Sequence, residues 1–160
     1  MTATPVIPPE DPVVAEMRSV PGLAEPPTTT RARRIVARTT TETLKDALGG
    51  LRALGFRHLS AISGVDLGGN FEVVYHLSGP RGVVVSLHAP VPKTAPRIPT
   101  VTPLFPVAGL YERECHDLLG IEFEGLADSR RLLLYEGWPE GQYPLRKDWK
   151  PPTSGGEKHA

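Results

Sequence analysis

Residues 71–87 read FEVVYHLSGPRGVVVSL, and this stretch decides which kind of fold the chain can form. Large apolar residues recur at every second position from Phe71 to Leu77, which is the period of a half-buried strand. Residues 78–82 combine glycine and proline and are typical of a turn. The run from Val83 to Leu87 then returns as a second strand. The stretch therefore predicts an antiparallel β-hairpin.

Upstream of the hairpin, the pattern changes from strand to helix and back to strand. Residues 34–37 predict a short strand, and His58 to Val65 predict another. Between them, Thr39 and Glu42 have the spacing of a capping box at the start of a helix. Leucines follow at spacings of three and four and form one apolar stripe, and Gly55 is a suitable stop.

Downstream of the hairpin, proline recurs every few residues from Ala89 to Pro106. Proline has no amide proton and avoids helix interiors and central strands, so we expect an extended connector across the surface. Val107 to Leu119 then predict a helix that ends at Gly120. The whole pattern indicates an α+β fold, a two-layer domain with helices packed on one mixed sheet.

The two ends of the chain differ in composition from its middle. Residues 1–30 are rich in proline and threonine, and we interpret them as an extended N-terminal arm with at most a helical turn near Val13 to Met17. Residues 150–160 have the same character and are expected to form a flexible tail. The folded domain is therefore expected to span residues 31–149.

Composition excludes several classes of function. Lysine and arginine number 18, as do aspartate and glutamate, so the excess positive charge that nucleic-acid binding requires is missing. Cys115 is the only cysteine, so the chain forms no intrachain disulfide and cannot hold an iron–sulfur cluster alone. With a single thiol, we expect a reducing, cytoplasmic setting. Neither a signal peptide nor a membrane-spanning apolar run is visible.

The most distinctive stretch, residues 111–149, reads YERECHDLLGIEFEGLADSRRLLLYEGWPEGQYPLRKDW. Charges of both signs are interleaved here with leucines, aromatic residues and glycines. Buried or interfacial ion pairs would explain this pattern, because arginine binds carboxylates through a planar fork. A solvated surface helix and loop with weak, incidental ion pairs is the other interpretation.

The order of short motifs in this stretch resembles the signature of the 30 kDa subunit (the C subunit) of NADH-quinone oxidoreductase, which is respiratory complex I. The motifs are residues 111–114 (YERE), 117–121 (DLLGI), Phe123, 128–134 (DSRRLLL) and 144–149 (PLRKDW). The chain departs from that signature at Leu119, where the family usually has an aromatic residue, and at residues 126–127, where it usually has His-Pro. Residues 138–141 (WPEG) resemble instead the related subunit of energy-converting membrane-bound [NiFe] hydrogenases and formate hydrogenlyase-type complexes.

The resemblance implies a non-catalytic subunit in the electron-transfer arm of such a complex. Its implied partners are the large hydrogenase-like subunit (D type) and the small cluster-bearing subunit (B type). Iron–sulfur clusters, and a NiFe centre or quinone, would belong to the partners, with no cofactor in this chain. The chain would lie on the inner face of the cell membrane through these partners. The implied interface residues are Glu112, Arg113, Asp117, Arg130, Arg131, Arg146, Lys147 and Asp148.

Within that set, we expect Arg130 and Arg131 to form a charge network with Glu112 and Asp117. Two adjacent arginines in a strand-like run would point to opposite sides. One arginine would then bind an internal carboxylate while the other faces a partner.

Three other functions are suggested by parts of the sequence. Cys115 and His116 would suggest a cysteine hydrolase, but adjacent helix residues diverge by about a hundred degrees and cannot form a nucleophile–base pair. Cys115 is therefore expected in the core. Glu112 and His116 could share a helix face as metal ligands, although no further ligand lies at suitable spacing. A stand-alone interaction module with proline-rich segments is the third alternative.

Overall fold

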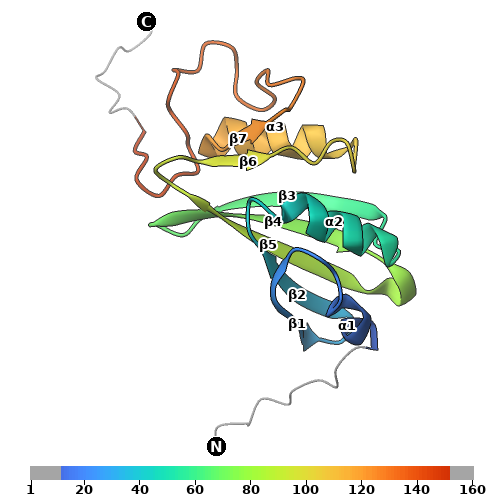
Figure 1. Ribbon diagram of the computed structural model, residues 1–160. Helices are drawn as coiled ribbons and strands as arrows, with labels where there is room; N and C mark the ends of the chain where they lie inside the picture. Colours follow the sequence, from blue (N-terminus) through green and yellow to red (C-terminus); the bar gives the residue numbers. More distant parts are fainter. Residues whose placement is uncertain (1–11, 152–160) are drawn as a thin grey trace, which may run out of the picture.

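The computed structural model describes residues 12–151, whose arrangement is shown in Figure 1. The main sheet has the strand order β1-β2-β5-β4-β3. Its strands are β1 (Leu23–Arg31), β2 (Arg34–Thr39), β3 (His58–Asp66), β4 (Asn70–Ser78) and β5 (Val84–Pro92). Strands β2 and β5 are parallel and the other neighbours are antiparallel, so the sheet is mixed, as predicted.

The predicted hairpin is present at the centre of this sheet. β4 and β5 pair without a break from Asn70 opposite Pro92 to Ser78 opposite Val84. A short 3-10 turn, η1 (Pro80–Gly82), completes the connection. On β4, the alternating side chains from Phe71 to Leu77 are fully buried, because every second residue of a strand faces the same side.

Three helices contribute to one continuous core: α1 (Pro12–Met17), α2 (Leu44–Ala53) and α3 (Ala108–Leu119). The leucine stripe of α2 is buried, as its spacing predicts. α3 packs against β3, where Gly64 leaves room for it: a Cβ there would collide with the side chain of Leu119. The two-layer α+β architecture is thereby confirmed.

A second, parallel sheet of two short strands lies beside α3, formed by β6 (Arg97–Pro99) and β7 (Glu122–Glu124). Figure 1 shows α3, β6 and β7 grouped at one end of the main sheet, while α1 and β1 lie at the other. The termini of the described chain are therefore far apart, and the C-terminal part belongs to the end that holds α3.

The helical turn predicted near Val13 to Met17 is present as α1, but the extended arm around it is wrong for residues 12–30. Helix α1 buries Val13, Val14 and Met17, and β1 pairs with β2 along the edge of the sheet. An edge strand needs hydrogen bonds on one side only, so it tolerates the prolines that suggested an arm. Residues 1–11 of the predicted arm lie outside the described residues.

The predicted capping box is also wrong, because the first helical residue of α2 is Leu44 and its cap carries no side-chain hydrogen bond. The hydroxyls of Thr39 and Thr43 instead donate to the carbonyl of Gly22, at 2.7 and 2.9 Å. These threonines join the start of α2 to the turn before β1.

The predicted surface connector differs from the structure at its start and in its middle. Residues 89–92 continue β5, and residues 97–99 form β6. β2 pairs with β5 only as far as His88, so β5 has a single neighbouring strand, β4, at Pro90 and Pro92. On the open side no strand needs an amide proton from these prolines. Ile98 and Val101 are buried, so this stretch forms part of the core.

No helix in residues 12–151 is long and apolar enough to span a membrane.

Candidate functional site: an anchored C-terminal segment

Residues 128–151, called here the C-terminal segment, contain neither helix nor strand. Figure 1 shows this segment (orange to red) looping over the end of the molecule that holds α3. Irregular backbone has few hydrogen bonds of its own, so other groups must fix its path. Four side chains do so, and most of the predicted interface residues take part.

Asp117, near the end of α3, binds three successive backbone amides of the segment. Its Oδ2 accepts N–H bonds from Leu132, Leu133 and Leu134 at 3.1, 2.8 and 2.9 Å. Burial alone would raise the pKa of Asp117, but these three amides and the charge of Arg131 lower it below its ordinary value. The carboxylate thus stays ionised. It replaces the backbone hydrogen bonds that a neighbouring strand would provide.

Arg113 binds the carbonyls that precede those amides. Its Nε and Nη2 donate to the carbonyls of Arg130 and Arg131 at 2.8 and 2.9 Å. Its Nη1 lies 3.5 Å from Asp128. Asp128 in turn accepts both ends of the Arg130 guanidinium, at 2.9 and 2.8 Å. This fork keeps the pKa of Asp128 well below its usual range.

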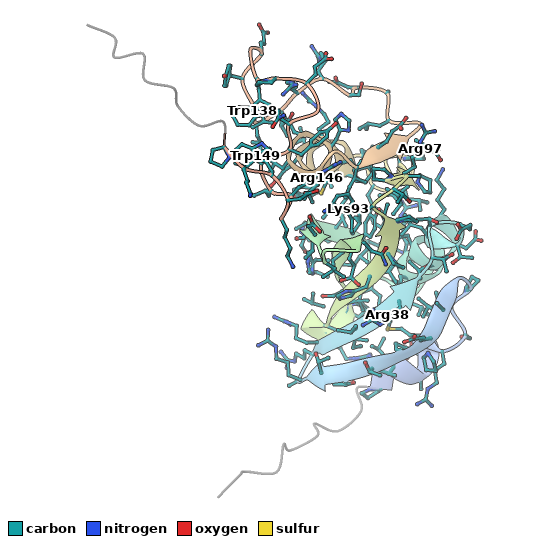
Figure 2. The ribbon with its side chains drawn as sticks, turned by 90° about the vertical axis from the view of Figure 1, so that its left-hand side faces the viewer. Arg38, Lys93, Arg97, Trp138, Arg146 and Trp149 are labelled. Carbon is teal, nitrogen blue, oxygen red and sulfur yellow. The ribbon has the colours of Figure 1, made fainter. Side chains whose placement is uncertain are left out.

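Arg146 fixes the far part of the segment against the sheet. Its Nε donates to the carbonyl of Leu119 at 2.7 Å. Its guanidinium lies over the rings of Tyr143 and Phe71, 4.3 and 5.2 Å from their centres. Planar arginine favours such stacking over aromatic faces. Figure 2 shows Arg146 beside Lys93, at the junction between sheet and segment.

Asp66, at the end of β3, completes the anchoring. Its side chain is 1% exposed and accepts bonds from Lys93 Nζ and from the Lys147 backbone N–H, each at 2.9 Å. The Lys93 bond is the largest cause that lowers the pKa of Asp66 to about 2. Lys93 also lies 3.3 Å from Asp148, so Lys147 and Asp148 are both held by this group.

Glu112 is fully buried and acts inside the domain. It accepts a hydrogen bond from the Thr100 hydroxyl at 2.6 Å and one from the Val101 N–H at 2.7 Å. Burial raises the pKa of Glu112, and the two hydrogen bonds offset this only in part. Glu112 therefore joins α3 to the chain that follows β6, and does not reach the molecular surface.

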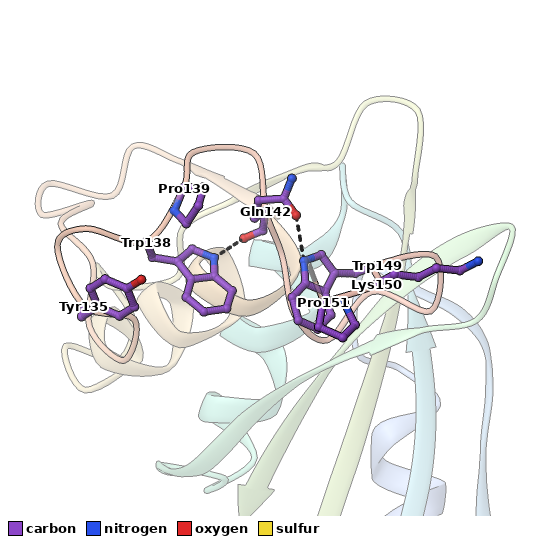
Figure 3. A pocket seen from close by; sticks show the side chains of 7 residues that line it. All are labelled: Tyr135, Trp138, Pro139, Gln142, Trp149, Lys150 and Pro151. Carbon is purple, nitrogen blue, oxygen red and sulfur yellow. Dashed lines mark hydrogen bonds between the residues drawn. The ribbon is translucent and has the colours of Figure 1, made fainter. Parts of the chain in front are cut away.

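An aromatic groove of about 600 Å³ runs along the outer side of the segment (Figure 3). The ring centres of Trp138 and Trp149 lie 6.1 Å apart, and both indole N–H groups donate to Gln142, one to its carbonyl and one to its side chain. Tyr135 packs edge-on against Trp138. The groove is lined by Tyr135, Trp138, Pro139, Gln142, Trp149, Lys150 and Pro151.

The predicted charge network is wrong in its partners. Among residues 12–151, neither Glu112 nor Asp117 forms an ion pair with Arg130 or Arg131 within 4 Å. The run at 130–134 is not a strand. Its amides at residues 132–134 donate to the carboxylate of Asp117 and not to a neighbouring strand. Arg130 instead pairs with Asp128, and Arg131 influences Asp117 only through its charge. Backbone groups are the partners that charge spacing alone could not reveal.

Sequence reasoning missed Asp66, Lys93 and Asp128 as members of the site. Asp66 lies in the turn DLGGN, where aspartate is expected for local reasons, and its Oδ1 does accept the Gly68 N–H. Its contact with Lys147 spans 81 positions and carries no local signal. The position of Asp128 two residues before Arg130 was the one visible clue.

The enzymatic alternatives find no support in the geometry. Cys115 is buried, and burial raises the pKa of its thiol to about 12, so it is no thiolate at neutral pH. Its predicted place in the core is confirmed. His116 Nδ1 lies 3.0 Å from the Ile121 carbonyl, while Glu112 faces Thr100. The described part of the chain holds no cluster of three metal-ligating side chains.

The geometry defines a class of protein: a two-layer α+β domain that presents a long, irregular and firmly anchored surface segment. A family model described as the respiratory-chain NADH dehydrogenase 30 kDa subunit matches residues 37–154. The chain therefore belongs to this family, as its signature motifs predict.

Two relatives come from different kinds of complex. The C subunit of NADH-quinone oxidoreductase from Herpetosiphon aurantiacus is 42% identical over 99 residues, which are 59% of this chain and 57% of that protein. The beta subunit of the membrane-bound hydrogenase from Pyrococcus furiosus is 38% identical over 87 residues, 54% of this chain and 50% of that protein. The chain thus spans about half the length of these relatives.

Two further comparisons add a longer polypeptide and a structure. Formate hydrogenlyase subunit 5 of Escherichia coli is 41% identical over 95 residues, which are 56% of this chain but 17% of that protein. A chain in the structure of the membrane-bound sulfane sulfur reductase, an archaeal respiratory membrane complex, is 28% identical with a TM-score of 0.75. That match covers 86% of this chain and 82% of the other.

Proposed function

We propose that this chain is a non-catalytic subunit of a membrane-associated oxidoreductase complex, of the NADH-quinone oxidoreductase or energy-converting [NiFe] hydrogenase type. In this proposal, the C-terminal segment docks on a large hydrogenase-like subunit and helps to position it beside a small cluster-bearing subunit. The chain would lie on the cytoplasmic face of the membrane, held there by these partners. The anchored C-terminal segment is the observation that carries the proposal.

The exposed side chains of the segment support docking. Leu132, Leu133, Tyr135 and Leu145 are between 36% and 65% exposed, although each is a large apolar residue. Clustered exposed apolar and aromatic side chains mark protein interfaces. A segment fixed in advance loses little conformational entropy on binding, so its anchoring favours association. A loop with no partner would need neither feature.

The match to formate hydrogenlyase subunit 5 supports the same conclusion. The matched region forms 17% of that protein, so a domain of this kind is part of a much longer polypeptide there. Covalent attachment keeps such a domain beside the rest of its chain. Non-covalent docking, as proposed here, would keep the domain beside a partner in the same way.

The proposal assigns the redox cofactors to the partners. Cys115, with its raised thiol pKa, is unsuited to ligate a cluster, since the ligating form is the thiolate. The chain would contribute position and rigidity, while electrons pass through clusters in neighbouring subunits. The stand-alone interaction module is less well supported, because Val91, Ile98 and Val101 of the proline-rich stretch are buried and unavailable as a ligand.

Purification of the full-length chain from its native cells would test the proposal. The tagged chain should recover membrane-derived partners, a large hydrogenase-like protein (D type) and a small cluster-bearing protein (B type), in equal amounts, as identified by mass spectrometry. Iron should be found in the assembly and be absent from the isolated chain. Recovery of the chain alone under conditions that keep such complexes intact would contradict the proposal, as would stoichiometric iron in the isolated chain.

A further inference from the structure

Arg131 differs from the other arginines around the segment. Arg113 and Arg146 donate to backbone carbonyls, and Arg130 holds Asp128. Arg131 is half-buried, yet within residues 12–151 its guanidinium has neither a hydrogen bond nor an ion pair. A guanidinium has five donors, so those of Arg131 can bind an acceptor from another molecule.

Arg131 lies where two hollows in the surface meet. One, of about 330 Å³, is polar and is lined by His116, Asp117, Ser129, Arg131, Glu140, Gly141 and Tyr143. The other, of about 490 Å³, is lined by Arg113, Arg130, Arg131 and Glu136. Arg131 therefore borders open space that a side chain of another molecule can enter.

The charges in the second hollow favour an anion. Three guanidiniums meet there, and two of them share the carboxylate of Asp128. Glu136 is exposed at the same hollow and forms no ion pair among the described residues. The charge of Arg131 otherwise acts on Asp117 without a direct ion pair, so Arg131 can still bind a further carboxylate. Arginine binds carboxylates with two parallel hydrogen bonds.

We propose that Arg131 binds an aspartate or glutamate side chain of a partner protein, with exposed Leu132 and Leu133 forming the apolar flank of the same contact. This inference rests on the proposed function, because it assigns the chemistry of the docking surface. The partner is thus expected to present a carboxylate beside an apolar hollow. Arginine next to apolar side chains is a common combination at the centre of interfaces.

A protein carboxylate fits better than an anionic lipid surface or a nucleic acid. The C-terminal segment has five basic and four acidic side chains, so its charges nearly balance, whereas anionic membranes and phosphate backbones select a large excess of positive charge. A single guanidinium beside leucines instead suits one charge at a defined position.

Charge reversal tests the contact in the assembled complex. Arg131→Glu should lower the yield of complex from native cells at least about tenfold, because it places two like charges together at the interface. Arg57→Glu is the matched control: Arg57 is exposed between α2 and β3 and should leave the yield unchanged. The thermal midpoint of each isolated variant shows whether the fold is kept. If Arg131→Glu unfolds the chain, the Arg131→Lys experiment below decides.

Arg131→Lys keeps the charge and introduces an amine that carbodiimide can join directly to a carboxylate. Applied to the purified complex, carbodiimide should link residue 131 to an aspartate or glutamate of another protein in the complex, located by mass spectrometry. Arginine at that partner position, combined with Arg131→Glu, should restore assembly. A link only to Asp117, Glu136, Glu140 or residues 152–160 would overturn the proposal, as would no link at all.

The two proposals can fail separately. If the complex assembles normally with Arg131→Glu, the docking chemistry is wrong and the proposed function stands. If the wild-type chain recovers no partner proteins, the proposed function itself fails. A cross-link to a partner carboxylate together with the loss of assembly in Arg131→Glu supports both.

Discussion

Asp66 and Lys147 are 81 positions apart in the sequence, yet the backbone N–H of Lys147 donates to the Asp66 carboxylate at 2.9 Å. The same carboxylate binds Lys93 and is almost completely buried. A single side chain at the end of β3 therefore determines where the last part of the C-terminal segment lies. Its ionisation should control both the stability of the domain and the position of the segment.

Lowering the pH should weaken this contact in a defined range. The folded state lowers the pKa of Asp66 from its ordinary value near 3.8 to about 2. A lowered folded pKa means that the stabilisation is complete above the unfolded pKa and is lost as pH falls through the folded one. Unfolding free energy should therefore drop between about pH 4 and pH 2, in the range set by those two pKa values.

Asp66→Asn isolates this contribution, because other carboxylates of the domain titrate in the same range. The variant should lose about 1.5–3 kcal/mol of unfolding free energy at pH 7, the usual contribution of hydrogen bonds to a charged group. Its loss should shrink toward pH 2. Denaturant unfolding of both proteins at pH 2, 4 and 7 is the measurement. A difference that does not change with pH would show that the Asp66 charge is unimportant.

Asp117 should be the most important residue for the order of residues 132–134. Asp117→Ala leaves three backbone amides without their acceptor, and these amides can then reach water only if the segment moves away. Hydrogen exchange at Leu132 to Leu134 should accelerate strongly, while amides of β4 keep their protection. Asp128→Ala is a useful comparison, because it removes a carboxylate of the same segment that holds side chains and not these amides. Equal exchange in both variants would contradict this role.

Glu112 should behave oppositely to Asp66 with pH. Burial raises the pKa of Glu112, so the folded state favours its neutral form. As pH rises above the ordinary pKa of glutamate, ionisation of Glu112 therefore favours the unfolded state. The contribution of Glu112 to the unfolding free energy is greatest at low pH. Glu112→Gln keeps an acceptor for Val101 and removes the charge. Its stability relative to wild type should rise from pH 4 to pH 8, whereas Glu112→Ala should be destabilised at both. A constant difference between Glu112→Gln and wild type over this range would contradict the raised pKa.

The sequence contained the elements of the fold but few of the contacts between them. The alternation from Phe71 to Leu77 and the leucine stripe of α2 predicted their elements because side-chain period follows backbone geometry. The family signature predicted that Asp117 and Arg146 matter. The partners of these residues are backbone groups of residues 119 and 132–134, which any residue type supplies equally, so composition could not reveal them. The N-terminal strand was missed because edge pairing tolerates prolines.

Gly120 and Gly141 offer a matched test of how tightly the segment packs. Both have a positive φ, 70° and 73°, which alanine adopts at a cost of about 1 kcal/mol. A Cβ at Gly141 would meet no atom within 4 Å, whereas one at Gly120 would collide with Tyr143 and Arg146. Gly141→Ala should therefore show the backbone cost alone. Gly120→Ala should lose roughly 2 kcal/mol more of unfolding free energy, because the stacked side chains of Tyr143 and Arg146 must shift away from α3.

Denaturant unfolding of the isolated variants measures the difference, and complex yield measures its consequence for docking. Equal losses in the two variants would mean that Tyr143 and Arg146 yield easily, and that the segment is less firmly anchored at Leu119 than the structure indicates.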